Sequence, residues 1–492
     1  MNTTIKRIIA IILAVMMITA LVGCGKGKRE VVQLTLSTED AEAILRAAGI
    51  VLPDPETAAG ANSVVQWFSW YDPFQNYSED EIMNTGYYTF QEKYGGKVDW
   101  IEVEWGQRYD GVANLILSGD PPDLYPGEAN TFPNFAIKGL YDAVNKYIDY
   151  NDPLWADMKD YAYKYFSLGD NVYMMVTDRS FGTVCPYNKR VMDEWGFDDP
   201  AELFYNDEWT WDVFTEMCME FSDPDEDRYA LDGWYFYKSI LRGTGSTIVS
   251  YDPNTNHFVS NLDLPGFDRA ADMLYNLSVN NCMYPWYANG WACRNSSIEG
   301  GGVRDGSCLF WPVSEWGFTG TVEEISAVWG DMTEGELMFV SLPRDPNGDG
   351  NYYLESSPNG YCIIKSCKNP DGVALLVSCM RFKAIDPTVV DIDRKQLKEV
   401  YLWNQDMLDM HDYLQNLVDT SDYLIMSYDA GMGDMINDTV GTIEGFSHSR
   451  NVSTWAQVKE ANADKLQYAI DELNATVDAF IASGGEVNAQ NP

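Results

Sequence analysis

The side chains of this sequence that could do chemistry are mainly carboxylates and aromatic rings. The chain has 75 Asp and Glu residues and 16 Trp, but only 3 His. His257, His411 and His448 lie far apart, and no HExxH, P-loop, GxSxG or dinucleotide-binding motif occurs. Carboxylates accept hydrogen bonds from hydroxyl groups, and aromatic rings stack on the apolar faces of sugars. The composition therefore favours binding of a hydroxyl-rich molecule, and it leaves open a pair of glycosidase carboxylates.

The charge of the chain excludes several classes of partner. The formal net charge is −42 at pH 7. Nucleic acid and anionic membrane surfaces would be repelled, and so would an anionic ligand at long range. Most of the carboxylates are expected to form a solvated surface. A neutral ligand therefore fits this sequence better than a charged one.

Strand and helix signals alternate between residues 89 and 144. Lys97–Glu104 alternates apolar and polar residues as a strand does, and apolar residues at helical spacing follow until Gly119. Leu124–Pro126 predicts a short strand and Phe132–Leu140 another helix. Short connections between such elements predict a parallel sheet covered by helices, which is an α/β fold.

The N-terminus has the pattern of an export signal. Lys6 and Arg7 precede an apolar run, Ile8–Leu21, that is short for a membrane span, and the sequence LVGC ends at Cys24. This ending is similar to a bacterial lipobox, which implies cleavage before Cys24 and lipidation of its thiol. An ordinary cleaved signal or a single anchor helix remains the alternative.

The ordered set of motifs resembles a known family. FQEKYGG, a strand, a Trp, a helix, SGDPPDL, an aromatic loop and KGL follow one another. This order is similar to the extracellular solute-binding proteins of ABC importers (family 1), in their carbohydrate-binding, maltose-binding-protein-like branch. The resemblance runs from about residue 64 to the C-terminus and rests on the order, because no single motif is decisive.

The resemblance implies an architecture and a role. The expected fold is α/β, a two-domain periplasmic-binding-protein fold of type II, in which two sheets flanked by helices are joined by a hinge of several crossings. The expected protein is a monomer without cofactor, anchored by lipid to the extracytoplasmic face of the cell membrane. It would bind a carbohydrate between its domains and dock on the permease subunits of an ABC transporter. The expected bounds are 1–23 for the signal peptide, 24–62 for the linker, 63–180 with 337–383 for the first domain, and 181–336 with 384–492 for the second.

Candidate ligand contacts follow from the loops that leave the carboxyl ends of sheet strands, where this fold class binds its ligands. The first-domain residues follow the strands 64–70 and 124–126, and Trp311 and Trp316 fall in a segment whose tryptophans often stack on ligand in the family. The alternative for Trp311 and Trp316 is packing in the core or in a lid. The predicted contacts are Trp70, Tyr71, Asp72, Glu128, Asn130, Trp234, Arg242, Trp311, Trp316, Asn359 and Tyr361.

One acidic loop has the spacing of a calcium site. Asp345, Asn347, Asp349 and Asn351 occupy the first alternate positions of an EF-type loop, and a glycine stands at the required turn. The closing glutamate is missing, so a glycine-rich turn is the better expectation and no metal is predicted with confidence in this chain.

Eight cysteines follow Cys24, and an even number in an exported protein permits disulfides. They show no CxxC pair and no zinc spacing, which argues against metal chelation. Free buried thiols are the alternative.

Two other classes of protein compete with the receptor. A glycan-active hydrolase would more often show a repeated eightfold strand–helix unit, which is not found here. An adhesive surface lipoprotein would not need two hinged domains. A receptor for a non-sugar solute such as a peptide is the third alternative. The sequence favours a binding protein over an enzyme.

Overall fold

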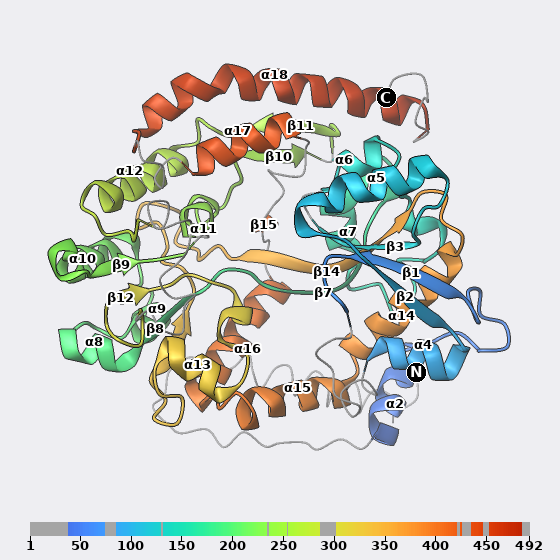
Figure 1. Ribbon diagram of the computed structural model, residues 1–492, viewed down its shortest axis with the longest axis horizontal. Coiled ribbons are helices and arrows are strands. Elements are labelled where there is room, and N and C mark those ends of the chain that lie inside the picture. The colour runs from blue at the N-terminus through green and yellow to red at the C-terminus, as the bar shows by residue number, and fades with distance from the viewer. Residues whose placement is uncertain are drawn as a thin grey trace.

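The computed structural model describes residues 38–73, 85–128, 131–233, 236–252, 254–285, 302–420, 424–425, 434–445 and 452–484. Figure 1 shows two lobes joined by strands that cross the middle of the molecule. Each lobe contains one larger sheet with helices packed on it. The structure confirms the predicted two-sheet α/β architecture. Within the described ranges, no helix is both long and apolar enough to cross a membrane.

The first sheet has the strand order β15-β14-β3-β1-β2. Its parallel part is formed by β1 (Val64–Ser69), β2 (Lys97–Glu102) and β3 (Leu124–Pro126), with Trp67 opposite both Trp100 and Leu124. Trp67 is 2% exposed, so the middle of this sheet is fully buried. The alternation of strand and helix signals in the sequence predicted this parallel part correctly.

Two helices that connect these strands end where glycine permits it. Helix α4 (Gly86–Tyr94) ends at Gly95 with φ 66°, and α5 (Arg108–Ser118) ends at Gly119 with φ 79°. Both glycines adopt the left-handed conformation that closes a helix without a Cβ penalty. Both predicted ends are therefore confirmed. The third predicted helix is shorter than expected, because α6 spans only Asn134–Ile137.

The second sheet has the strand order β13-β8-β12-β9. Its strands are β8 (Cys185–Asn188), β9 (Tyr229–Leu231), β12 (Cys308–Phe310) and β13 (Leu337–Val340). The helices α8 (Lys189–Trp195), α9 (Pro200–Tyr205), α10 (Trp211–Phe221), α11 (Phe236–Arg242), α12 (Pro265–Val279) and α13 (Val322–Trp329) belong to this lobe.

Strand β13 corrects one sequence prediction. It was expected to return the chain to the first domain, but it pairs antiparallel with β8 over Leu337–Val340 in the second sheet. All four of its residues are buried. The chain therefore returns later, in the connection 341–354 that leads to β14 (Glu355–Ile364).

Strands β7 (Met175–Phe181) and β14 join the lobes. They pair antiparallel from Ser356 opposite Phe181 to Tyr361 opposite Met175, and they run side by side across the middle of Figure 1. Helix α14 (Pro370–Ala384) then packs on α4. Helices α15 (Pro387–Glu399) and α16 (Gln405–Thr420) lead the chain back toward the second sheet. Helix α16 contacts both β7 and β13, so it links the two sheets.

The sequence predicts three helices in the C-terminal part, at Leu397–Leu417, Tyr423–Ile436 and Val452–Ile481, the last with Ser453 as its N-cap. The structure differs from this prediction. Leu424–Ile425 forms the short strand β15 on the edge of β14, where a helix was expected. Helices α17 (Asp434–Glu444) and α18 (Trp455–Ala482) follow. The side chain of Thr454 caps α18, one residue after the predicted cap.

The cysteines of the described residues are all free thiols, and six of the seven are buried, with Cys367 half-buried. Burial raises the pKa of the Cys185 and Cys218 thiols far above the ordinary value. Neither thiol is therefore ionised at neutral pH. Cys24 and Cys293 lie outside the described residues.

The contact between α4 and α14 generates a stability prediction. A Cβ on Gly86 would lie 2.3 Å from the backbone of Met380, which cannot move without shifting α14. We expect Gly86→Ala to destabilise the protein by about 3 kcal/mol, at the upper end for overpacking. A Cβ on Gly441 in α17 would meet nothing within 4 Å. Gly441→Ala is the matched control and should be neutral or slightly stabilising in urea unfolding. Equal midpoints for the two variants would contradict the packing of α4 on α14.

Candidate functional site

The carboxyl ends of β1, β2 and β3 bring an aromatic cluster together on the first lobe. Trp70 and Tyr71 follow β1, and Trp105 begins the short helix η1 (Trp105–Gln107) that follows β2. The Trp70 ring meets those of Trp105 and Tyr71 edge-to-face at 4.9 and 5.3 Å. Trp105 is 56% exposed and Tyr71 41% exposed. Trp70 thus packs against the rings of Tyr71 and Trp105, and both of these rings are exposed to solvent.

A charged pair lies under this cluster. Arg108, the first residue of α5, donates from Nε to Glu128 Oε1 at 3.0 Å, and its guanidinium lies 3.5 Å from the centre of the Trp105 ring. The hydroxyls of Tyr109 and Tyr125 each donate to Glu128 at 2.8 Å. The carboxylate of Glu128 therefore accepts bonds from three side chains, and the guanidinium supports the exposed indole by a cation–π contact.

The protonation states within this cluster are set by its burial and pairing. Burial alone would lower the pKa of Arg108, but the hydrogen bond and charge of Glu128 outweigh it and raise that pKa. Burial first, and then the charge of Glu128, raise the pKa of Tyr125 far above its ordinary value. Arg108 therefore stays charged and Tyr125 stays a neutral donor at any physiological pH.

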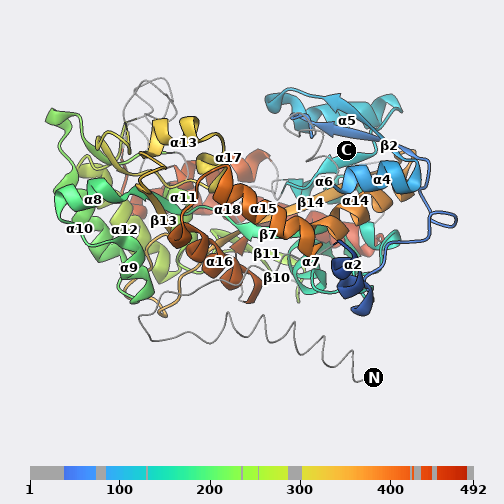
Figure 2. The same cartoon turned by 90° about the horizontal axis from the view of Figure 1, so that it is seen from below.

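The second lobe presents one exposed indole. Trp316 lies in the short helix η7 (Glu315–Phe318) and is 57% exposed. Its neighbour Phe318 is fully buried and packs on Trp403 with ring centres 5.6 Å apart. Helix α13, which follows η7, and helix α5 lie on the same side of the molecule in Figure 2, one on each lobe. Trp105 and Trp316 lie in the short helices that precede α5 and α13 in the chain.

Glu315, beside Trp316, is fixed by a histidine of α16. Its Oε1 lies 3.4 Å from Nε2 of His411. Burial raises the pKa of Glu315, and His411 opposes this shift. The pKa of His411 is raised as well, because its bond to Asp412 and the charge of Glu315 outweigh the effect of burial. Helix α16 therefore holds the residue that precedes the exposed indole.

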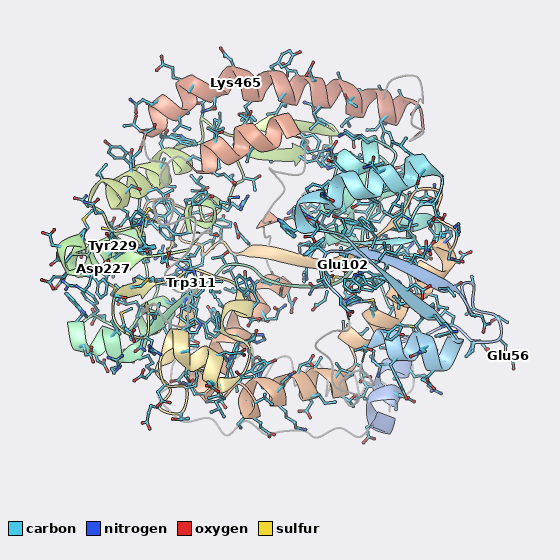
Figure 3. All side chains as sticks on the ribbon, in the orientation of Figure 1. Glu56, Glu102, Asp227, Tyr229, Trp311 and Lys465 are labelled. Atoms are coloured by element: carbon cyan, nitrogen blue, oxygen red, sulfur yellow. The ribbon has the colours of Figure 1, made fainter. Side chains whose placement is uncertain are left out.

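Trp311 lies inside the second lobe rather than on a ligand-facing surface. It is 4% exposed, and its ring stacks on Trp329 at 5.1 Å. Figure 3 shows its label among the side chains of that lobe. Trp311 is therefore packed in the core of this lobe. Of the two tryptophans, only Trp316 presents its ring to solvent.

Arg242 is part of a buried ion cluster. It was expected on a strand and turn, but it is the last residue of α11. It is 4% exposed and donates to Glu355 at 3.0 Å and to Glu444 at 2.8 Å. Lys238 also pairs with Glu444 at 3.3 Å. Both partners hold the guanidinium in the interior of the structure, and its contact with a ligand stays a prediction.

Asn359 and Tyr361 lie within β14 rather than in a turn before it. Asn359 stands opposite Asp178 of β7, and the ring of Tyr361 meets Trp67 edge-to-face at 5.2 Å. Asp72 is half-buried next to Tyr71. Both β14 residues thus lie on the strand that crosses between the lobes. Asn130, Trp234 and Cys24 lie outside the described residues.

Trp105 and Arg108 were missed by the prediction from sequence. The rule that selected Trp70 and Glu128 takes residues that follow the carboxyl ends of strands, and β2 ends at Glu102. Figure 3 places Glu102 toward the middle of the molecule. Applying the same rule to β2 would have found the indole and the guanidinium.

The acidic loop does not have the arrangement of a calcium site. Asp345 Oδ2 accepts from Arg269 at 2.6 Å, which puts a cation where a metal ion would bind. The carboxylates of Asp345 and Asp349 also accept from the backbone N–H groups of Asn347 and Asn351. No group of three or more metal-binding side chains occurs among the described residues. The loop forms a turn, which was the structure that the sequence favoured.

Part of the chain is similar to a known protein family. Residues 69–280 match the model of the bacterial extracellular solute-binding protein family. A search of curated proteins gives no match. Over these residues the chain is similar to the bacterial extracellular solute-binding proteins.

Solved structures extend the likeness of the fold to most of the chain. An ABC substrate-binding protein of Listeria monocytogenes in complex with cycloalternan is 15% identical, with a TM-score of 0.57 over 85% of this chain and 99% of that one. The acarbose-binding GacH receptor of Streptomyces glaucescens is 14% identical, with a TM-score of 0.56 over 82% and 98%. The galacto-N-biose-/lacto-N-biose I-binding protein of Bifidobacterium longum is 15% identical, with a TM-score of 0.55 over 87% and 100%. The fold is the two-domain, type II fold of such binding proteins.

The Arg108–Glu128 pair generates the prediction for this site. The two side chains are 8% and 12% exposed. Replacing Glu128 by Ala leaves a largely buried guanidinium and two tyrosine hydroxyls without their acceptor. We expect a loss of about 3 kcal/mol in the free energy of unfolding, as for other broken buried pairs. Glu104→Ala, an exposed glutamate of the same loop region, should change it by less than about 0.5 kcal/mol. Similar losses in chemical denaturation would contradict the role of this pair.

Proposed function

We propose that this protein is a membrane-anchored extracytoplasmic receptor that binds a sugar or oligosaccharide between its two domains and delivers it to an ABC permease. The observation that carries the proposal is the exposed aromatic cluster of Tyr71 and Trp105 on the first lobe, together with exposed Trp316 on the second. Exposed aromatic rings that cluster on a surface are typical of binding sites, and they stack well on sugar rings.

The polar groups near the cluster add the selectivity that a sugar site needs. Glu128 and Arg108 are already oriented by each other and by two tyrosines. Because this pair is already ordered, binding of ligand hydroxyl groups to it costs little conformational entropy. The bound molecules of the similar solved structures, cycloalternan, acarbose and lacto-N-biose, support a carbohydrate as the ligand class.

Binding would close the two domains. We assign the first domain to residues 63–180 with β14 and α14, and the second domain to the second sheet with α16. Strands β7 and β14 and the segment around α15 would form the hinge. A ligand that contacts Trp105 and Trp316 together does so best in a closed form, so it shifts the population toward that form.

Lipidation of Cys24 and docking on a permease complete the proposed role. The LVGC sequence after a short apolar run supports the anchor. The match to the solute-binding family supports the partnership with an ABC transporter. We also propose that the protein acts as a monomer and carries out no catalysis.

Loss of the exposed rings should weaken sugar binding without unfolding the protein. We expect Trp105→Ala and Trp316→Ala each to remove about 1–2 kcal/mol of binding free energy, which is roughly 5- to 30-fold in Kd. Calorimetric titration of the protein with maltooligosaccharides, cyclic glucans and β-galactosides measures this.

The control is Tyr468→Ala, which removes a 58% exposed ring from the outer face of α18. It should leave Kd unchanged. Analysis of the recovered sugar distinguishes the rivals, because a receptor returns it intact and a hydrolase does not. Binding that persists in both tryptophan variants would overturn the proposed site, and a response to peptides alone would overturn the sugar assignment.

A further inference from the structure

A pocket lies among elements of the second lobe. Its volume is about 460 Å³. The lining comes from three segments: the residues after α11, the first turn of α12, and the connection that leads to β14. No residue of the aromatic cluster contributes to it. Its lining combines the apolar side chains of Leu264 and Pro265 with polar residues such as Thr244, Ser246, Asn347 and Asn351.

Glycines keep the pocket open. A Cβ on Gly266 would lie 3.0 Å from Thr244, and a Cβ on Gly348 would lie 3.3 Å from Asp345. The volume falls within the range of roughly 300–1,000 Å³ that is usual for small-molecule sites.

The charges of the lining are already satisfied by the protein itself. Asp345 accepts from Arg269 and from the backbone of Asn347, and Asp349 accepts from the hydroxyl of Tyr353 at 2.5 Å and from the backbone of Asn351 at 3.0 Å. A metal ion or an ammonium group would face Arg269. An anion would face Asp349, whose pKa is lowered chiefly by the Tyr353 hydroxyl.

Neutral hydrogen-bonding groups are what the pocket offers to a ligand. Asn347 uses its backbone N–H group in the turn, which leaves its side-chain amide outside that bond, whereas the side chain of Asn351 interacts with Asp349 and Tyr353. The Thr244 hydroxyl donates to Leu241 and can still accept, and Ser246 and the ring of Tyr353 complete the lining. Amides, hydroxyls and one aromatic ring together match a small neutral polyhydroxylated molecule.

We propose that this pocket is a second ligand site, which binds a monosaccharide or linear polyol independently of the site between the domains. An occupant would touch the connection 345–353, which enters β14 at Glu355. It would also bridge that connection to α12, which the Arg269–Asp345 ion pair already joins.

The test uses the purified protein with its first site disabled by Trp105→Ala and Trp316→Ala together. Saturation-transfer NMR with D-glucose, D-galactose, D-mannitol and D-sorbitol as probes reports weak binding directly. At least one probe should bind in the millimolar range or better. Ser246→Trp, which fills the pocket, should weaken that probe at least tenfold, and Asn347→Ala with Asn351→Ala should weaken it as well.

Ser118→Trp is the matched control, because Ser118 is exposed at the end of α5 on the other lobe. It should leave the signal unchanged. Absence of any signal from the four probes, or a signal that survives Ser246→Trp, would overturn the second site. Neither outcome tests the proposed site between the domains, because oligosaccharide binding by the unmodified protein is measured separately.

Discussion

The pairing of β7 with β14 is the constraint on which the rest of the structure depends. It runs from Ser356 opposite Phe181 to Tyr361 opposite Met175, with a register shift between Asn359 and Gly360. These are the strands that Figure 1 shows crossing the middle of the molecule. Each lobe has its own sheet, so the relative position of the lobes depends on this ladder and on the segments beside it.

Buried charges fix the start of that ladder on the second lobe. Glu355, the first residue of β14, is 4% exposed and pairs with Arg242, which also pairs with Glu444 of α17. Burial raises the pKa of Glu355, and the charge of Arg242 opposes this shift. Such a cluster contributes little net stability, because desolvation offsets the attraction. Its consequence is geometric, because it sets where α11 and α17 lie relative to β14.

The sequence predicted the local elements of the first lobe better than the pairing of the strands that join the lobes. The helix ends at Gly95 and Gly119 could be predicted, because a helix end at glycine depends on the local backbone conformation and not on distant contacts. Which sheet β13 joins depends instead on contacts with β8, far away along the chain. Trp311 and Trp316 show the same limit. Five residues apart in one segment, they look equivalent in sequence, yet one stacks inside on Trp329 and the other is exposed.

A distance measurement between the lobes tests the central claim, that a sugar is bound between two domains that close on it. Spin labels can be placed at Leu117→Cys on α5, where Leu117 is 84% exposed, and at exposed Glu323→Cys on α13. The seven described native thiols are buried or half-buried, and Cys24→Ser and Cys293→Ser remove the others. Pulsed electron paramagnetic resonance should then show a shorter distance when an oligosaccharide that binds in calorimetry is saturating. An unchanged distance at saturation would contradict closure of the domains on the sugar.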